Sequence, residues 1–162
     1  MGRQGVRLAL IWGVFMAFRI VTQVRAPVKK VFELVEDYEK RKQWMEGLEN
    51  LEFTSQFDPA NPLGATFKQT IREGKNLNEY SGKIVAFQRP SRLGIDMGNA
   101  QFTIHADYRF AETAQGTRVN AYFSFSYHNP MAWLMGLLFG WFTKRISGRQ
   151  MEALKRLAEA AP

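Results

Sequence analysis

Cysteine is missing from this 162-residue chain, and histidine occurs only twice, as His105 and His128. The lack of cysteine excludes disulfides, thiolate metal sites and cysteine nucleophiles, and two histidines are too few for a histidine-rich metal centre. We therefore expect neither a metal nor a cofactor. A chain without cysteine also suits a reducing compartment, so we expect a cytoplasmic protein that can associate peripherally with a membrane.

Acidic residues are scarce at both ends of the chain, whose net charge is +7. Residues 1–32 carry six basic side chains and no acidic one, and residues 144–156 carry five basic side chains against Glu152. Such clusters can attract anionic lipid or nucleic acid, although they more often form a solvated surface. We expect no nucleic-acid binding, because the aromatic residues belong to faces predicted to be buried. Transient contact with a membrane surface remains an alternative.

Long hydrophobic runs are absent too. The apolar runs at residues 8–18 and 131–142 are shorter than the ~20 residues that a membrane-spanning helix needs. The first run follows two arginines, as in a signal peptide, but no small-residue cleavage site follows it, and cleavage there would cut the first predicted strand. We interpret residues 1–15 as an accessory segment and residues 16–162 as one domain.

The periodicity of apolar residues predicts an α+β chain. Residues 18–24 alternate as a strand does. From Val28 the apolar residues recur at helical spacing, and residues 39–44 indicate a second short helix. From Leu48 onward a period of two predicts six consecutive antiparallel strands, each with one apolar face. The segment from Pro130 to the C-terminus predicts a long helix, which Gly136 and Gly140 can bend or interrupt.

Three stretches carry a family resemblance: "VRAPVKKVFELVEDYEKRKQWMEGLENLEF" (24–53), "GKIVAFQRPSRL" (82–93) and "YRFAETAQGTRVNAYFSF" (108–125). With the order of elements, they resemble the START-like SRPBCC superfamily, in particular its bacterial polyketide cyclase/dehydrase-like members. The resemblance implies a helix-grip fold: a seven-stranded curved antiparallel sheet around a long C-terminal helix, with two short helices between strands 1 and 2. It also implies a cavity between the sheet and that helix, which holds apolar ligands such as lipids, quinones or polyketides.

The inward faces of these elements give the candidate ligand-binding residues. Gln69 shares a face with Phe67 and Ile71, and a buried amide needs a partner, which a ligand, Tyr80 or Tyr108 can supply. Met131 to Phe142 is too apolar for a surface helix, so we expect part of it to face the sheet. The full set is Phe53, Phe67, Gln69, Tyr80, Ile95, Ile104, Tyr108, Phe123, Phe125, His128, Trp133, Leu137 and Trp141.

Three functions fit this pattern. The first is binding or transport of a hydrophobic small molecule, and the second is a cyclase- or aromatase-type enzyme that uses the same cavity. The third is a protein-interaction module whose cavity is filled by side chains. His105 and Asp107 share a strand face and could act as an acid–base pair, but alternating polar residues are more often the wet side of a sheet. We therefore assign no catalytic residue and favour binding over catalysis.

Overall fold

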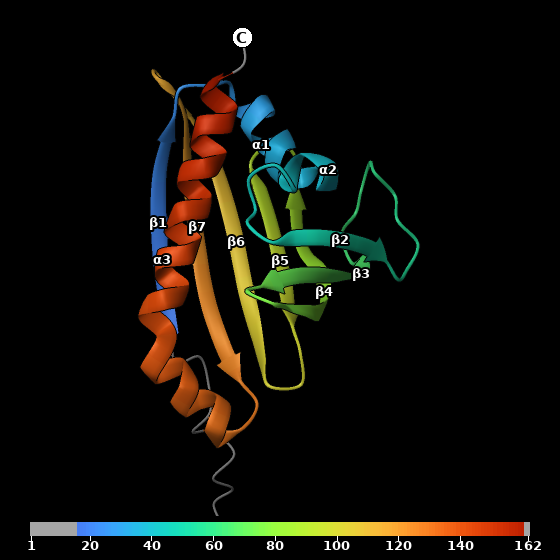
Figure 1. The fold of residues 1–162 in the computed structure, drawn as a ribbon. Coiled ribbons are helices and arrows are strands. Elements are labelled where there is room, and N and C mark those ends of the chain that lie inside the picture. The colour runs from blue at the N-terminus through green and yellow to red at the C-terminus, as the bar shows by residue number, and fades with distance from the viewer. Residues whose placement is uncertain (1–15, 161–162) are drawn as a thin grey trace, which may run out of the picture.

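A single antiparallel sheet of seven strands forms the body of the computed structural model, which describes residues 16–160 (Figure 1). The accessory segment expected at residues 1–15 lies outside the described residues. The strands are β1 (Met16–Val24), β2 (Leu48–Phe53), β3 (Thr66–Glu73), β4 (Asn76–Gln88), β5 (Arg92–Gly98), β6 (Phe102–Thr113) and β7 (Gly116–Tyr127). They are ordered β1-β7-β6-β5-β4-β3-β2 in the sheet.

The described residues form three helices, all on one face of this sheet. Helices α1 (Val28–Glu36) and α2 (Tyr38–Arg41) separate the first two strands, and α3 (Pro130–Ala160) runs along β1 and β7 (Figure 1). The predicted helix-grip fold is therefore confirmed. The second short helix ends at Arg41, earlier than expected, and the chain turns through residues 42–44 until Trp44 is buried.

Helix α1 forms because its apolar residues fall on one side. Val28, Val31, Phe32 and Val35 are all buried. Its last turn is followed by Asp37, whose carboxylate accepts a hydrogen bond from the backbone N–H of Lys40 and so caps α2. The cap separates the two helices, and α1 lies close to α3 and to strands β6 and β7.

Helix α3 is one continuous element of 31 residues. Figure 1 shows its first turns running at an angle to the rest, in keeping with the bend expected near its glycines. Gly136 lies directly against Tyr127, and Gly140 against Met16, since a Cβ at either position would overlap those side chains. At these two positions small residues therefore form the contact between α3 and the sheet.

That contact corrects the expected orientation of α3. Leu137 and Trp141, which we predicted to face the sheet, point outward and are exposed. Trp133 is half-buried and packs against the core. The physical reason is distance: at Gly136 and Gly140 the helix approaches Tyr127 and Met16 so closely that a larger side chain would not fit there.

Candidate functional site

A cavity of about 730 Å³ lies under α1 and α2. It is bounded by these helices, by the loop of residues 54–65 and by strands β2 to β5. Its wall is mainly apolar, and the lining aromatic and aliphatic residues are Phe32, Leu51, Phe53, Phe57, Phe67, Ile84, Phe87, Leu93 and Ile95. The volume lies within the range of roughly 300–1,000 Å³ that is usual for small-molecule sites.

This position differs from the one expected between the sheet and the C-terminal helix. None of the residues lining the cavity belongs to α3 within the described part of the chain. The space between α3 and the sheet is filled by packed side chains, among them Phe18, which stacks on Phe123 with ring centroids 5.2 Å apart. Met151 and Leu154 complete this packing from the helix. Aromatic side chains thus fill the space between α3 and the sheet, whereas the space beneath α1 and α2 contains the cavity.

The mouth of the cavity is tied together by Arg89. Its Nε donates to the Glu36 carboxylate at 2.9 Å, and its Nη2 donates to the Pro59 carbonyl at 2.9 Å. The guanidinium also lies over the Phe87 ring, 5.0 Å from the centroid. One side chain therefore joins the end of α1, the end of β4 and the 54–65 loop.

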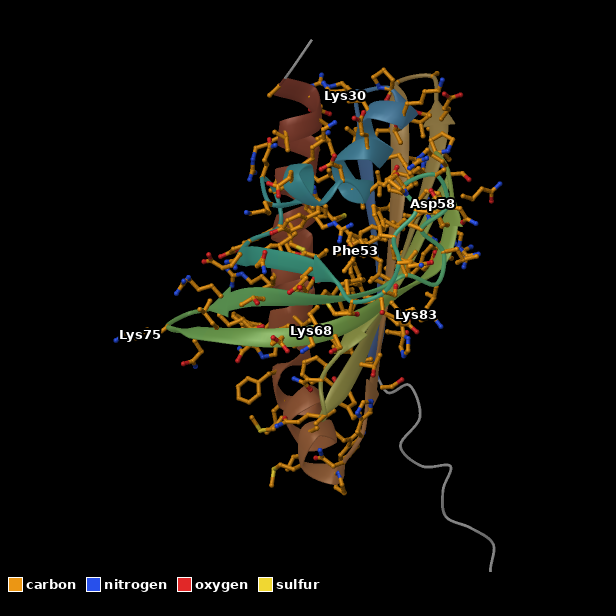
Figure 2. All side chains as sticks on the ribbon, turned by 90° about the vertical axis from the view of Figure 1, so that its right-hand side faces the viewer. Lys30, Phe53, Asp58, Lys68, Lys75 and Lys83 are labelled. Carbon is orange, nitrogen blue, oxygen red and sulfur yellow. The ribbon has the colours of Figure 1, made fainter. Side chains whose placement is uncertain are left out.

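The loop itself contributes an aromatic wall. The Phe57 ring stacks on Phe53 with centroids 3.9 Å apart, although Phe57 is partly exposed. Figure 2 shows Phe53 at the middle of the molecule, between α1, where Lys30 lies, and the β3–β4 hairpin that carries Lys68 and Lys75. Phe57 of the 54–65 loop therefore extends the apolar wall that Phe53 begins on β2.

A smaller cavity of about 40 Å³ lies deeper and carries the polar groups. Arg41 and Ile95 line both cavities. Gln69, which is buried, donates from its side chain to the sulfur of Met97 and not to Tyr80 or Tyr108. Tyr108 faces the same small cavity. The inner end of the apolar site is therefore polar.

Arg41 is the most unusual residue of this inner end. Only 8% of its surface is exposed. Its Nε donates to the Val35 carbonyl at 2.9 Å and its Nη2 to the Glu36 carbonyl at 3.2 Å. It forms no ion pair with any carboxylate of residues 16–160. Burial lowers its pKa, and the negative charge of Asp37 opposes this shift only in part. The C-terminal carbonyls of α1 hold the guanidinium in place but do not neutralise it.

Tyr108 completes the polar end as a hydrogen-bond donor. Burial raises the pKa of its hydroxyl to about 12, and the nearby charge of Arg41 opposes that rise only in part. The hydroxyl therefore keeps its proton at neutral pH. The ring packs edge-on against Phe123, with centroids 5.8 Å apart, which fixes its orientation.

The structure divides the predicted ligand-binding residues into two groups. Phe53, Phe67, Gln69, Ile95, Ile104 and Tyr108 line one or both cavities. The remaining residues line neither of them: Tyr80, Phe123, Phe125, His128, Trp133, Leu137 and Trp141. For both groups a role in ligand binding stays a prediction.

Two members of the second group have clear structural partners. The Tyr80 hydroxyl donates to the Glu73 carboxylate at 3.0 Å, and burial, followed by that hydrogen bond, raises its pKa. His128 is exposed, and its ring nitrogens lie 3.0 Å from the Thr103 hydroxyl and 3.3 Å from the Ala100 carbonyl oxygen. His128 thus ties the β5–β6 turn to the end of β7.

Sequence reasoning missed Arg41 and Arg89. Both lie in polar stretches, "EKRKQW" and "FQRPSR", that are typical of solvated surface. No pattern in the sequence distinguishes Arg41 from Lys40 and Lys42 beside it. Phe32 and Phe87 were missed as wall residues for another reason, since an apolar residue that lines a cavity has the same periodicity as one in a filled core.

In the structure His105 contacts Asp96 and Ser126, and not Asp107 as the acid–base hypothesis required. His105 Nδ1 lies 2.8 Å from Asp96, and Nε2 lies 3.0 Å from the Ser126 hydroxyl. Asp107 instead accepts hydrogen bonds from Arg92 and Arg109, both at 2.9 Å. Ser126, His105 and Asp96 are connected in the order of a catalytic triad, but they lie on the sheet face opposite the helices.

That face offers no support for acyl transfer. The three residues are on neighbouring strands whose backbone N–H groups belong to the ladder of β5, β6 and β7. No pair of N–H donors is therefore left to stabilise an oxyanion there, which is usually the largest contribution to such catalysis. We interpret Ser126, His105 and Asp96 as a cross-strand network that stabilises the sheet.

Among the helices of residues 16–160, none has both the length and the apolar character to cross a bilayer.

Comparison with known proteins places the chain within one family. Residues 17–159 match the model of a family described as polyketide cyclase/dehydrase and lipid transport. No curated protein matches the chain.

Solved structures show the same fold at low sequence identity. An uncharacterized protein from Rhizobium leguminosarum is 13% identical, with a TM-score of 0.70 over 90% of this chain and 95% of that one. Ara h 8.0201 is 14% identical, with a TM-score of 0.69 over 92% of this chain and 100% of that one. The di-domain ARO/CYC StfQ from the steffimycin biosynthetic pathway is 11% identical, with a TM-score of 0.71 over 89% of this chain and 51% of that one.

Proposed function

The chain belongs to the polyketide cyclase/dehydrase and lipid transport family, and on that premise we propose that it binds an amphipathic small molecule with an acidic group. The apolar body of the ligand fills the 730 Å³ cavity, and its acidic group reaches Arg41 at the inner end. The observation that carries the proposal is a buried guanidinium, without a carboxylate partner among the described residues, at the end of an apolar cavity.

The energetics of burial support this arrangement. A charge removed from water costs several kcal/mol unless an opposite charge or hydrogen bonds compensate it. The carbonyls of Val35 and Glu36 use two of the five N–H donors that a guanidinium has. A ligand carboxylate, enolate or phenolate would supply a negative charge in direct contact, which the more distant Asp37 does not, and the Tyr108 hydroxyl can donate a further hydrogen bond to it.

The experiment compares two probes that differ only in their polar end. A dansyl-labelled medium-chain fatty acid and the corresponding alcohol are titrated into the full-length protein. We expect the acid to bind more tightly, and the variant R41M to lose that preference by about tenfold, since a charge-assisted hydrogen bond contributes ~1.5–3 kcal/mol. Arg118, which is exposed on β7, provides the control variant R118M.

Two outcomes separate the alternatives, and one control accompanies them. Equal binding of acid and alcohol by the wild type contradicts the role of Arg41 while leaving the apolar cavity intact. No binding of either probe, with no small molecule extracted from the purified protein, contradicts the proposed function itself. A melting curve for R41M shows whether the variant still folds, because Arg41 also holds the end of α1.

A cyclase-type enzyme is the second candidate, and one observation favours it. Tyr108 keeps its proton at neutral pH because its pKa is raised to about 12, so it can donate a hydrogen bond to a ligand carbonyl beside Arg41. Such a pair would stabilise an enolate during ring closure. Loss of turnover of a poly-β-keto substrate in Y108F, with binding retained, would support catalysis over transport. The open cavity disfavours the third hypothesis, an interaction module with a filled interior.

A further inference from the structure

The first third of helix α3 exposes a continuous apolar surface. Eight large side chains between Met131 and Phe142 are 42% to 67% exposed. We call them the apolar α3 face: Met131, Leu134, Met135, Leu137, Leu138, Phe139, Trp141 and Phe142. No other element between residues 16 and 160 exposes a comparable group of large apolar side chains.

These side chains do not pack against the sheet. At about 100° per residue they cover about 200° of the helix circumference. The opposite side carries Ala132, Gly136 and Gly140, which contact the sheet through Tyr127 and Met16. The helix is therefore held to the sheet by its small residues and presents its large ones to the surroundings.

The charge around this face has one sign. No acidic residue lies between Glu112 and Glu152 in the sequence. Lys144 and Arg145 follow the face directly on α3, and both are exposed. Basic residues next to exposed apolar ones are attracted to anionic lipid, and tryptophan and other aromatic residues favour the boundary between headgroups and acyl chains.

We propose that the apolar α3 face docks into the surface of a lipid bilayer, with Lys144 and Arg145 at the headgroups. No helix of the described residues can span a membrane; in this docking the first turns of α3 lie at the interface with their apolar side inserted. Figure 1 shows the first turns of α3 at the opposite end of the molecule from α1 and α2. Docking therefore leaves the mouth of the ligand cavity clear of the bilayer.

The test measures cosedimentation of the full-length protein with vesicles of equal parts phosphatidylcholine and phosphatidylglycerol. We expect wild type to bind and L138S/W141S to bind about tenfold more weakly or worse, because two large apolar side chains are removed from the inserted face. The variant L77S is the matched control, since Leu77 is similarly exposed but lies on β4.

A second pair of variants tests the charge. K144Q/R145Q should weaken binding to these vesicles and leave the weaker binding to pure phosphatidylcholine unchanged, and added salt should have the same effect. K75Q/K83Q, in which both substitutions are on exposed lysines of the β3–β4 region, should bind as wild type does. Equal losses in both pairs would contradict docking through this end of the molecule.

Two results overturn the proposal. One is wild-type protein that stays in solution at every vesicle concentration. This result would mean that something other than lipid, such as a second copy of the chain or residues 1–15, covers the face. The other is wild-type vesicle binding by L138S/W141S. Sedimentation velocity distinguishes the second copy, because L138S/W141S would then convert a dimer to a monomer. Binding of the dansyl fatty acid by L138S/W141S should equal that of wild type, so this test is independent of the proposed function.

Discussion

Individual residues decide where the interior of this protein is filled and where it is hollow. Gly136 and Gly140 bring α3 onto Tyr127 and Met16, whereas Arg41 lines the polar end of the cavity. The sequence predicted glycines that bend α3, but not that they form its contact with the sheet. A glycine in a helix is compatible with a kink, a close approach or neither, and only the residue opposite it distinguishes these cases.

The close approach at Gly136 predicts a stability change of unusual sign. Alanine normally stabilises a helix relative to glycine by ~1 kcal/mol, but here its Cβ would overlap the Tyr127 ring. We expect G136A to lower the free energy of unfolding by ~1–3 kcal/mol, as overpacking does. In the control G148A, nothing lies near the added Cβ, so stability should rise. Urea denaturation measures both, and a stabilised G136A would contradict the contact.

Asp107 predicts a dependence of stability on pH. Burial alone would raise its pKa, but hydrogen bonds from Arg92 and Arg109 outweigh burial and leave the pKa below its ordinary value. Because the pKa is lower in the folded state, the stabilisation is complete above the unfolded pKa of ~3.9 and is lost as pH falls through the folded pKa.

The variant D107N measures this contribution. We expect it to be less stable than wild type by ~1 kcal/mol near neutral pH, with the difference shrinking below about pH 4. Urea denaturation at a series of pH values follows this change. A difference that is constant with pH would show that the carboxylate charge is not what the two arginines stabilise.

At the scale of elements, the periodicity of apolar residues predicted the helices and strands but not the position of the cavity. The order of strands and helices was predictable because each strand alternates and α1 repeats at helical spacing. The position of the cavity was not predictable. Phe32 and Phe123 both belong to apolar faces, but Phe32 lines the cavity whereas Phe123 packs in the filled core. The segment "DPANPLG" predicted a loop, but nothing in it indicated that the loop covers the cavity.

We expect the 54–65 loop to control the rate at which a ligand leaves the cavity. Arg89 joins it to α1 through Pro59 and Glu36, so R89A should release the loop and speed dissociation of the dansyl fatty acid several-fold. Stopped-flow displacement measures this rate. The control is R72A, which breaks the Arg72–Glu49 pair at 2.6 Å on the sheet edge, away from the cavity. Equal rates in R89A and wild type would mean that the loop does not limit exchange.

At the scale of the whole molecule, the two halves of the sheet pack against different elements. The β2–β5 half carries the cavity, and the half formed by β1 and β7 packs against α3. The apolar run at residues 131–142 was predictable as non-spanning from its length alone. Its outward direction was not predictable, because it depends on which side of α3 meets the sheet.

The position of β1 at the edge of the sheet has a consequence for biosynthesis. Among residues 16–160, Met16–Val24 pairs with β7 alone, along residues 117–125, and with no strand that lies closer in sequence. A chain leaving the ribosome must therefore carry the first strand without a partner until nearly all of the sheet has been made. Contacts so distant in sequence form late, and an unpaired apolar strand is prone to aggregate while it waits. Translation that stops before β7 should thus leave β1 as a target for chaperones, even though β2 to β6 can already pair with one another.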